Sequence, residues 1–556
     1  MATKLNSKIF LTIFFLLIIG LLSFAQLSNH DTGFHLKTGE YIIENLKIPT
    51  TDVFSYTAIG QAWVNHYWFS DVVMYLVNRI LGYWGLIFFV SLVAVATYIV
   101  LYKTSKIFGS NQWSILFVSA LYSIFFIIIW SYWSARPQIF GFFLCALLIF
   151  ILEKWRSSGN KKWLALSVPV IFVWANSHAS VILGIFLVAV YIGIFLIPRI
   201  KIPSLWIKEV VWGILVCVVT LANPNGLKVL TYSWNISDAV KEVGIFEWIS
   251  IWPYLFSPNP QKARIVFIFM VAVLIFVLWV MFYKLRVLKK IKLRHLVLLV
   301  TAFILPLISV RHVGFFPILT FPLLTDSLDY FLVKKLAEKK YFNLIKIGIF
   351  VFGLALLVVG LWKIPSTPIS EKSLPERAGN FISENKIQGP IFNTISHGSY
   401  LIWKIWPQEK VFIDGRSEVY PLEIWSDYKK IMEVGDEWKG LFNKYNFQIA
   451  ILSSNVPIKE DSFVQTDIIL AYKLVTEMGF KLIFWDDSTI ILIKDIPANK
   501  KIISEYGYKI IGPYLAPQQI PLNQSKDAAR EIKRAMEMAP FSEQISTYGA
   551  VFLKTH

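Results

Sequence analysis

Residues 28–40 read SNHDTGFHLKTGE, and they follow directly after an apolar run, 9–27, near the start of the chain. An apolar run of that length can cross a bilayer, whereas the segment after it is too polar to lie in lipid. The polar character continues to residue 79, and the segment carries the ionisable residues Asp31, His35, Glu40, Asp52, His66 and Asp71. This order predicts a first membrane span followed by an extramembrane loop, 28–79, that gathers many ionisable side chains.

The composition of the whole chain is that of a membrane protein. Of its 556 residues, 56% are hydrophobic and only 16% are charged, which is typical of a polytopic α-helical membrane protein. The net charge of +18 comes from Lys and Arg, many of them in short loops between apolar runs, where the positive-inside rule expects them. The charge therefore predicts contact with a membrane and no nucleic-acid partner. Cys145 and Cys217 both fall inside apolar runs and give no disulfide framework.

Hydropathy predicts about eleven membrane spans, each near 20 residues long. Their ranges are 9–27, 84–102, 113–130, 139–152, 163–175, 179–198, 210–222, 265–283, 296–310, 315–332 and 345–362. For the first range a cleaved signal peptide is the alternative, since Lys4 and Lys8 precede it and Ser23-Phe24-Ala25 resembles a cleavage site. We expect a retained span, because the apolar core is longer than that of most signal peptides.

Basic residues occupy every second loop, and this pattern predicts the orientation. The loop after range 265–283 alone holds Lys284, Arg286, Lys289, Lys290, Lys292 and Arg294. The positive-inside rule puts such loops, and the N-terminus with them, on the inner side of the plasma membrane. Asn176-Ser177-His178 must then separate two spans, because fusing these spans would put the basic loop outside.

The composition changes near residue 365, and this change divides the chain into domains. Residues 1–364 form the predicted transmembrane domain, which includes the first outer loop, 28–79, and an aromatic outer loop, 223–263, that suggests short amphipathic helices. Residues 365–497 predict an α/β domain on the outer side. Its helices are expected at 373–386 and 463–478, and its strands at 390–393, 410–414, 448–453, 481–485 and 489–494. Residues 498–556 predict a linker and a helical tail of tetratricopeptide type.

Asp31 is the candidate catalytic residue. A carboxylate beside a membrane-embedded cavity can act as a general base toward an acceptor hydroxyl or amine. The alternative is structural, with Asp31 capping a helix that runs from residue 32 to residue 40. The sequence alone does not decide between these two roles.

Two arginines are candidates for binding a lipid-linked phosphate at the membrane surface. Arg311, in VRHVGFF, stands at the outer end of the ninth span, and Arg136, in WSARP, at the outer end of the third. A guanidinium group stays charged and matches the geometry of phosphate. For each arginine the alternative is a side chain that extends toward lipid headgroups.

Other polar residues at the outer ends of the spans are candidates for substrate binding. They are His35, Asp52, His66, Asn176, His178, Glu247 and His312. His178 and Asn176 suit a hydrogen bond to the donor or to Asp31, with a structural turn as the alternative. Glu247 stands beside Trp248, a pairing that suits a sugar, although an exposed acid on an amphipathic helix fits equally well. No metal site is predicted, because the chain has no His-x-x-x-His or paired Cys spacing.

Residues 31–40, DTGFHLKTGE, and 48–55, IPTTDVFS, together with the first span, resemble the start of multi-span glycosyltransferases of the GT-C class. More narrowly, the chain is similar to prokaryotic members related to protein mannosyltransferases. Those enzymes use a polyprenyl-phosphate-linked sugar and keep a catalytic acid in the first outer loop. The resemblance implies that Asp31 is the base. It also implies functional positions for Asn176, His178, Arg311, Asp414, Gly415 and Arg416.

The reaction expected from this resemblance is an inverting transfer of one sugar from a polyprenyl-phosphate donor to a glycan, lipid or protein acceptor. Arg311, helped by Arg136, would hold the leaving lipid phosphate. Oligosaccharyltransferases of the class hold a divalent metal through an acid between the third and fourth spans, and they carry a Trp-Trp-Asp signature. The turn at Arg136 has no acid and residues 484–487, FWDD, do not match the signature, so metal-independent transfer without a cofactor is favoured over metal-dependent transfer.

Two other functions are alternatives. A transporter or flippase for a lipid-linked saccharide would need internal repeats or broken helices that line a path through the membrane. A non-catalytic membrane assembly factor would act through its outer domain. The sequence shows no internal repeat, and its unusual polar residues are all predicted on one face of the membrane, so we expect a glycosyltransferase.

Overall fold

The computed structural model describes residues 2–128, 133–199, 201–202, 206–232, 248–256, 261–288, 292–334, 339–454 and 464–555. The chain divides into two compact units. One, the helical unit, comprises Met1–Gln26 and Asn65–Pro368, and the other, the mixed unit, comprises Leu27–Val64 and Ile369–His556. Most of the predicted loop 28–79 therefore belongs to the same compact unit as the C-terminal residues, which the predicted domain limits did not anticipate.

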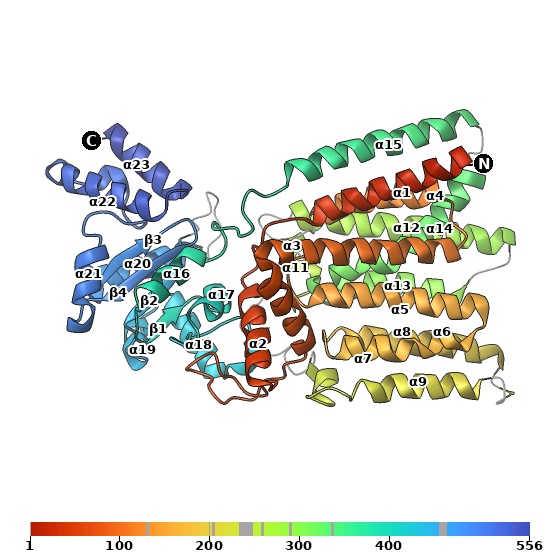
Figure 1. Ribbon diagram of the computed structural model, residues 1–556, viewed down its shortest axis with the longest axis horizontal. Helices are drawn as coiled ribbons and strands as arrows, with labels where there is room; N and C mark the ends of the chain where they lie inside the picture. Colours follow the sequence, from red (N-terminus) through yellow and green to blue (C-terminus); the bar gives the residue numbers. More distant parts are fainter. Residues whose placement is uncertain are drawn as a thin grey trace. The chain divides into compact units, whose positions relative to one another are not determined.

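In its described part the helical unit consists of helices, the longer of which run side by side (Figure 1). They are α1 (Ala2–Ser23), α3 (Trp68–Ile107), α4 (Gln112–Ile128), α5 (Gln138–Ser158), α6 (Lys161–Ala165), α7 (Ser167–Ala175), α8 (Val181–Leu196), α9 (Ile207–Val219), α11 (Ile251–Leu255), α12 (Gln261–Leu288), α13 (Leu293–Ile308), α14 (Phe315–Lys334) and α15 (Lys339–Trp362). Two 3-10 turns, η2 (Ile197–Arg199) and η5 (Val310–Gly314), lie between them. Every apolar range predicted as a span falls largely on one or two of these helices.

Five helices in the described part of the chain are long and apolar enough to cross a membrane. They are Trp68–Ile107, Gln138–Ser158, Val181–Arg199, Gln261–Arg286 and Asn343–Trp362. Three shorter stretches, Ile9–Ser23, Gln112–Phe125 and Leu293–Ile308, are also apolar. These helices support a membrane protein, whereas the count of about eleven spans and the orientation of the chain stay predictions.

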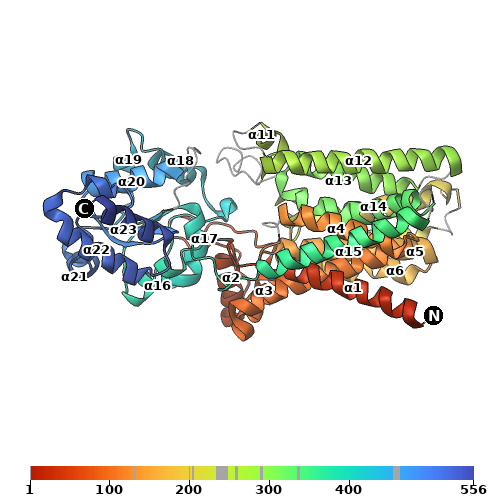
Figure 2. The ribbon, with the colours of Figure 1, turned by 90° about the horizontal axis from the view of Figure 1, so that it is seen from above.

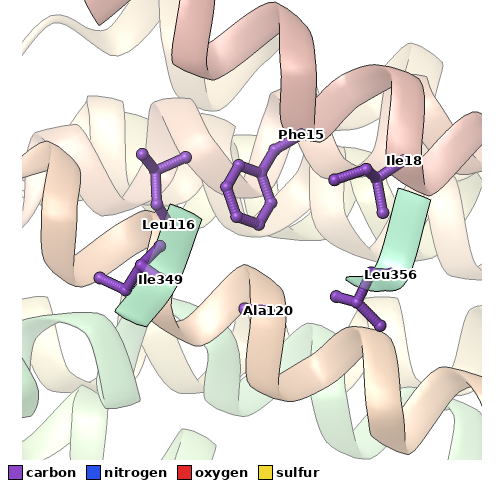
Figure 3. Packing of buried hydrophobic residues seen from close by; sticks show 6 residues of the cluster. All are labelled: Phe15, Ile18, Leu116, Ala120, Ile349 and Leu356. Carbon is purple, nitrogen blue, oxygen red and sulfur yellow. The ribbon is translucent and has the colours of Figure 1, made fainter. Parts of the chain in front are cut away.

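The first and last helices of the helical unit pack together against α4, and Figure 2 shows α15 along the side of α1. Apolar side chains form the centre of this contact. Phe15 and Ile18 of α1, Leu116 and Ala120 of α4, and Ile349 and Leu356 of α15 form a buried cluster (Figure 3). This packing joins the two ends of the helical unit and so closes it.

Two breaks in the helices agree with the sequence pattern. Gly82 has φ 64° and ψ −167°, a conformation open to glycine, and it divides α3 into a first segment and the apolar span beyond. Residues 176–180 separate α7 from α8, at the place where the charge pattern required a break. The second break matters for function, because it holds Asn176 and His178.

The mixed unit contains a four-stranded sheet in the order β1-β2-β4-β3. β1 (Ile391–Asn393) is parallel to β2 (Ile449–Ser453), and β4 (Thr489–Lys494) is antiparallel to both β2 and β3 (Phe480–Trp485). The strands are buried on both faces, as sheets covered by helices are. The strand predicted at 410–414 is wrong, because this segment forms only one bridge, between Val411 and Ser55.

The mixed unit also contains helices, and one of them, which packs on α17, comes from the N-terminal part of the chain. They are α2 (Thr32–Asn45), α16 (Glu376–Glu384), α17 (Ile395–Ile405), α18 (Leu422–Met432), α19 (Trp438–Lys444), α20 (Val464–Glu477), α21 (Lys500–Tyr506), α22 (Ser525–Met538) and α23 (Glu543–Thr555). A Cβ atom on Gly33 of α2 would lie 2.5 Å from Tyr400 Cα, so only glycine permits this approach to α17. The last two helices form a pair, while their tetratricopeptide character stays a prediction.

Candidate functional site

Asp31 lies immediately before α2 in the mixed unit. Its backbone is helical, with φ −63° and ψ −21°, and its side chain makes no hydrogen bond that caps the helix. Its backbone N–H donates to Asn29 Oδ1 at 3.0 Å. The structural alternative for Asp31 was that its carboxylate caps the helix. The carboxylate does not have this role.

The carboxylate of Asp31 lies against the backbone of Gly415. A Cβ atom on Gly415 would be 2.7 Å from Asp31 Oδ1 and 2.8 Å from Ser399 Oγ, closer than side chains approach. Ser399 Oγ also accepts a hydrogen bond of 2.8 Å from Gly415 N. Position 415, in Asp414-Gly415-Arg416, therefore requires glycine, because a side chain there would collide with the carboxylate of Asp31.

Arg416 is completely buried and joins two carboxylates. Its Nη2 atom lies 2.7 Å from Asp52 Oδ1 and 2.7 Å from Asp414 Oδ2, and its Nε donates to Asp414 Oδ1 at 2.9 Å. The guanidinium also packs on the rings of Phe54 and Trp63, at 5.0 and 4.7 Å from the ring centroids. These contacts hold the segment around Asp52 against residues 414–416.

Asp52 is enclosed by these contacts. Burial alone would raise the pKa of this carboxyl group, but the charge of Arg416 and hydrogen bonds from Ser55 hold the pKa below its usual value. Ser55 donates from both its N–H and its hydroxyl group to Asp52 Oδ2, at 3.0 and 2.6 Å. His35, a second predicted substrate-binding residue of this unit, is buried on α2 with its ring 4.1 Å from that of Phe34.

Two imidazoles lie near Asp31, and sequence reasoning singled out neither. The ring centroids of His30 and His397 are 5.8 Å apart. Burial lowers the pKa of His30 to about 4, although the charge of Asp31 opposes this. His397 is also buried; its Nε2 atom lies 3.1 Å from the carbonyl oxygen of Ser488, so Nε2 carries the hydrogen and Nδ1 accepts from the Thr394 hydroxyl group.

In the helical unit, His178 is held by a chain of hydrogen bonds in the break between α7 and α8. Trp174 Nε1 donates to Ser180 Oγ at 3.0 Å, and Ser180 Oγ lies 2.8 Å from His178 Nδ1. Ser180 N also donates to Nδ1 at 3.1 Å, which makes Nδ1 an acceptor and leaves the hydrogen on Nε2. Gly141 of α5 makes room for this chain, since a Cβ there would lie 2.8 Å from Ser180 Oγ.

Asn176 uses its amide to connect three elements. Its Nδ2 donates to the carbonyl oxygens of Phe172 and Ala222, at 2.9 and 3.2 Å. Its Oδ1 accepts from Trp68 Nε1 at 2.9 Å. These bonds hold the start of α3, the end of α7 and the segment after α9 together beside His178.

Five predicted site residues come together in the helical unit: His66, Arg136, His178, Arg311 and His312. We call them the polar cluster. The other four all act electrostatically on His178, and the His66 and His178 ring centroids are 6.3 Å apart. Burial and these neighbours lower the pKa of His178 well below its usual value, and burial with Arg311 lowers that of His312 to about 4. The two arginines of the cluster keep their positive charge, because a guanidinium group stays protonated.

The Nε–H donor of Arg311 has no hydrogen-bond partner among the described residues. Its guanidinium carbon lies 4.8 Å from the ring centroid of Trp248. Within the described residues, the buried Nε of Arg311 and Nδ1 of His312 make no hydrogen bond. Buried polar atoms are nearly always paired in proteins, so the Nε–H donor of Arg311 indicates a ligand with acceptor oxygens.

An apolar groove of about 660 Å³ lies between α8 and α13 and leads to this cluster. It is lined by Ala179, Ser180, Ile182, Leu183, Phe186, Leu296, Val297, Val300, Thr301, Ile304, Leu305, Ile308, His312 and Phe315. Ile304 and Ile308 are 46% and 60% exposed, so the groove opens on the outside of the helical unit. Ser180 and His312 belong to its lining and connect it to His178 and Arg311.

Sequence reasoning missed this groove because α8 and α13 are apolar on several sides and show no distinctive face. Glu247 lies outside the described residues, as do the other residues of 233–247 and 257–260 in the aromatic loop. Across the described ranges, no group of three or more His, Cys, Asp or Glu side chains is arranged to hold a metal ion.

Comparison with known proteins gives a fold but no family by sequence. No family model and no curated protein matches the chain. The oligosaccharyltransferase of Archaeoglobus fulgidus in its apo form matches with a TM-score of 0.57 at 10% identity, over 97% of this chain and 85% of that chain. Two further structures cover the same shares, with TM-scores of 0.56. One is this archaeal protein with an inhibitory peptide and a dolichol-phosphate, at 11% identity, and the other is its complex with Zn and sulfate, at 12%.

Proposed function

We propose that this chain, which has the GT-C fold of the archaeal oligosaccharyltransferase, is a membrane glycosyltransferase that uses a polyprenyl-phosphate-linked sugar donor. One observation carries the proposal: the apolar groove between α8 and α13 leads to the polar cluster with its two arginines. The structural neighbour solved with a dolichol-phosphate adds support from the fold.

The groove and the polar cluster match the two parts of such a donor. A polyprenyl tail is a long hydrocarbon, and each buried methylene group contributes about 0.8 kcal/mol to binding. The phosphate needs cations and hydrogen-bond donors, which Arg311, Arg136 and the Nε2–H group of His178 would supply. Arg311 is assigned the main contact with the leaving phosphate, because its buried Nε makes no hydrogen bond in the described residues.

Asp31 is assigned the role of general base in an inverting transfer. It would accept the proton of the acceptor hydroxyl or amine while the acceptor atom attacks the anomeric carbon. The bond from that carbon to the phosphate oxygen breaks, and the lipid phosphate leaves with the electron pair. Because Asp31 makes no capping hydrogen bond, catalysis is now favoured over the structural role for its carboxylate.

Transfer without a metal is a further part of the proposal. The turn at Arg136 offers no carboxylate, and the arginines would take over the stabilisation of the leaving phosphate. We expect that a chelator added to the purified protein leaves the transfer rate unchanged. A rate that falls with EDTA and returns with a divalent ion would contradict this part alone.

The test uses the full-length protein in lipid nanodiscs with undecaprenyl-phosphate-linked sugars and extracted membrane acceptors. Asp31→Asn should lower transfer by about 10²–10⁴-fold, the usual contribution of a general base, with donor binding intact. Arg311→Gln should weaken binding of undecaprenyl phosphate itself. Arg286→Gln is the matched control, because Arg286 packs on Phe282 near the end of α12 and does not belong to the polar cluster. Unchanged transfer by the Asp31→Asn protein with the correct donor would end the assignment.

A further inference from the structure

A second group of arginines lies at the far end of α5 from Arg136. Arg156 is near the C-terminal end of this helix, and its two ends are about 30 Å apart at 1.5 Å per residue. Arg199 ends η2, and Arg294 lies in the first turn of α13. We call Arg156, Arg199 and Arg294 the arginine cluster; it shares no residue with the proposed donor site.

One carboxylate compensates one of these three charges. Glu153 is buried, and its two oxygens accept from Nε and Nη2 of Arg294 at 2.8 and 3.0 Å. Tyr191 donates a further hydrogen bond of 2.8 Å to the same carboxylate. The next acid along the chain, Glu209, forms an ion pair with Lys161 at 2.9 Å. Neither carboxylate forms an ion pair with Arg156 or Arg199 in the described residues.

Arg156 and Arg199 instead share an aromatic ring. Their guanidinium carbons lie 5.0 and 4.2 Å from the ring centroid of Phe195. Arg199 donates to the Phe195 carbonyl oxygen at 3.0 Å, whereas the buried Nε of Arg156 makes no hydrogen bond within the described residues. The charges of Arg294 and Arg199 repel Arg156, and that of Glu153 attracts it.

We propose that the arginine cluster binds the phosphate group of an anionic phospholipid. A phosphodiester would bring one negative charge between Arg156 and Arg199, and acceptor oxygens for the unpaired Nε of Arg156. The surroundings favour a lipid over free phosphate. Ile197 and Ile202, next to Arg199, are 65% and 52% exposed, and such side chains contact acyl chains readily. This site is independent of the proposed glycosyl transfer.

The test measures the melting temperature of the full-length protein in mixed micelles. Phosphatidylglycerol should raise it by about 2–4 °C relative to phosphatidylcholine, as a ligand that binds only the folded state does. Arg156→Gln and Arg199→Gln should abolish this rise, and Arg156→Lys should keep part of it. Arg286→Gln should keep all of it, because Arg286 is another arginine that packs on a phenylalanine near a helix end.

Three outcomes decide the proposal. An equal rise in the wild type and in Arg156→Gln and Arg199→Gln would overturn it. A rise produced fully by inorganic phosphate would overturn the assignment to a lipid. Native mass spectrometry gives a reading that does not depend on stability: the wild type should retain one phosphatidylglycerol that both glutamine variants lose, and equal retention would also overturn the proposal.

Discussion

At the scale of residues, the segment around Asp31 and the Asp-Gly-Arg sequence depend on each other. Arg416 binds Asp52 and Asp414, and these two buried ion pairs hold the two segments in a fixed register. Because Gly415 has no side chain, the carboxylate of Asp31 can lie close to its Cα atom. Burying an arginine between two acids costs desolvation free energy, so Arg416 adds little to stability. Its main effect is to fix the positions of Asp52, Asp414 and the neighbouring Gly415.

The position of Asp31 can be tested by substituting its neighbour. Gly415→Ala would place a Cβ atom 2.7 Å from Asp31 Oδ1, so the carboxylate must move. On the proposed function, a displacement near 1 Å lowers the transfer rate by about 10²-fold. The rate and the KM for the acceptor are measured in nanodiscs. Gly440→Ala is the control, since a Cβ there meets nothing within 4 Å. Equal rates for both variants would show that the approach to Gly415 has no bearing on catalysis.

At the scale of elements, the neutral imidazole of His397 connects α17 with the turn before β4. Its Nδ1 accepts a hydrogen bond from the Thr394 hydroxyl group, and its Nε2 donates to the Ser488 carbonyl oxygen. Burial lowers the pKa of His397 to about 3. Asp467 of α20 is affected in the opposite direction, because burial raises the pKa of its carboxyl group to about 7.

These two residues should give opposite slopes of stability against pH. Between pH 6.5 and 4 the unfolded chain protonates His397 and the folded chain does not, so acid removes about 3 kcal/mol of stability. Between pH 4 and 7 the folded chain keeps the proton of Asp467 that the unfolded chain loses, so stability falls as pH rises. Unfolding of the full chain is measured by limited proteolysis across this range. His397→Gln should reduce the loss toward acid, and Asp467→Asn the loss toward neutral pH; parallel curves would contradict both assignments.

Elements differ in how far the sequence predicted them. Apolar ranges became helices because hydropathy and helix length suffice for that inference, and the alternation of basic loops located the break at residues 176–180. The segment 410–414 looks like a strand because it is apolar and buried. It forms no ladder, since Asn393 binds the backbone of Phe412 and Ile413 through its side chain instead. Side-chain to backbone bonds of this kind leave no periodic signal.

At the scale of the whole molecule, the proposed chemistry is divided between the two compact units. The mixed unit contains Asp31, and the helical unit contains the groove and the polar cluster. The sequence predicted the residues at both places from their charge near span ends. It could not show that 27–64 belongs with the C-terminal residues, because the Asp52–Arg416 pair joins positions far apart in the chain. The fold likeness agrees with the predicted GT-C class.

The groove gives the most discriminating test of the donor assignment, because tail and phosphate can be weakened separately. Ile304→Trp would fill part of the groove and should weaken binding of undecaprenyl phosphate about tenfold, the effect of losing roughly 1.4 kcal/mol. Binding of a short-chain prenyl phosphate, which needs the arginines but little of the groove, should change much less. Ile275→Trp is the matched control, because Ile275 on α12 is 61% exposed and is absent from the groove lining.

Arg311→Gln should weaken both ligands alike, since both carry the phosphate. Affinities are read from the change in melting temperature with added lipid. If Ile304→Trp affects the long and the short lipid equally, the groove does not hold the tail. If it affects neither while Arg311→Gln affects both, the phosphate binds at the polar cluster and the tail follows another path. Only a loss confined to the long lipid fits a donor that lies along α8 and α13 with its phosphate at Arg311.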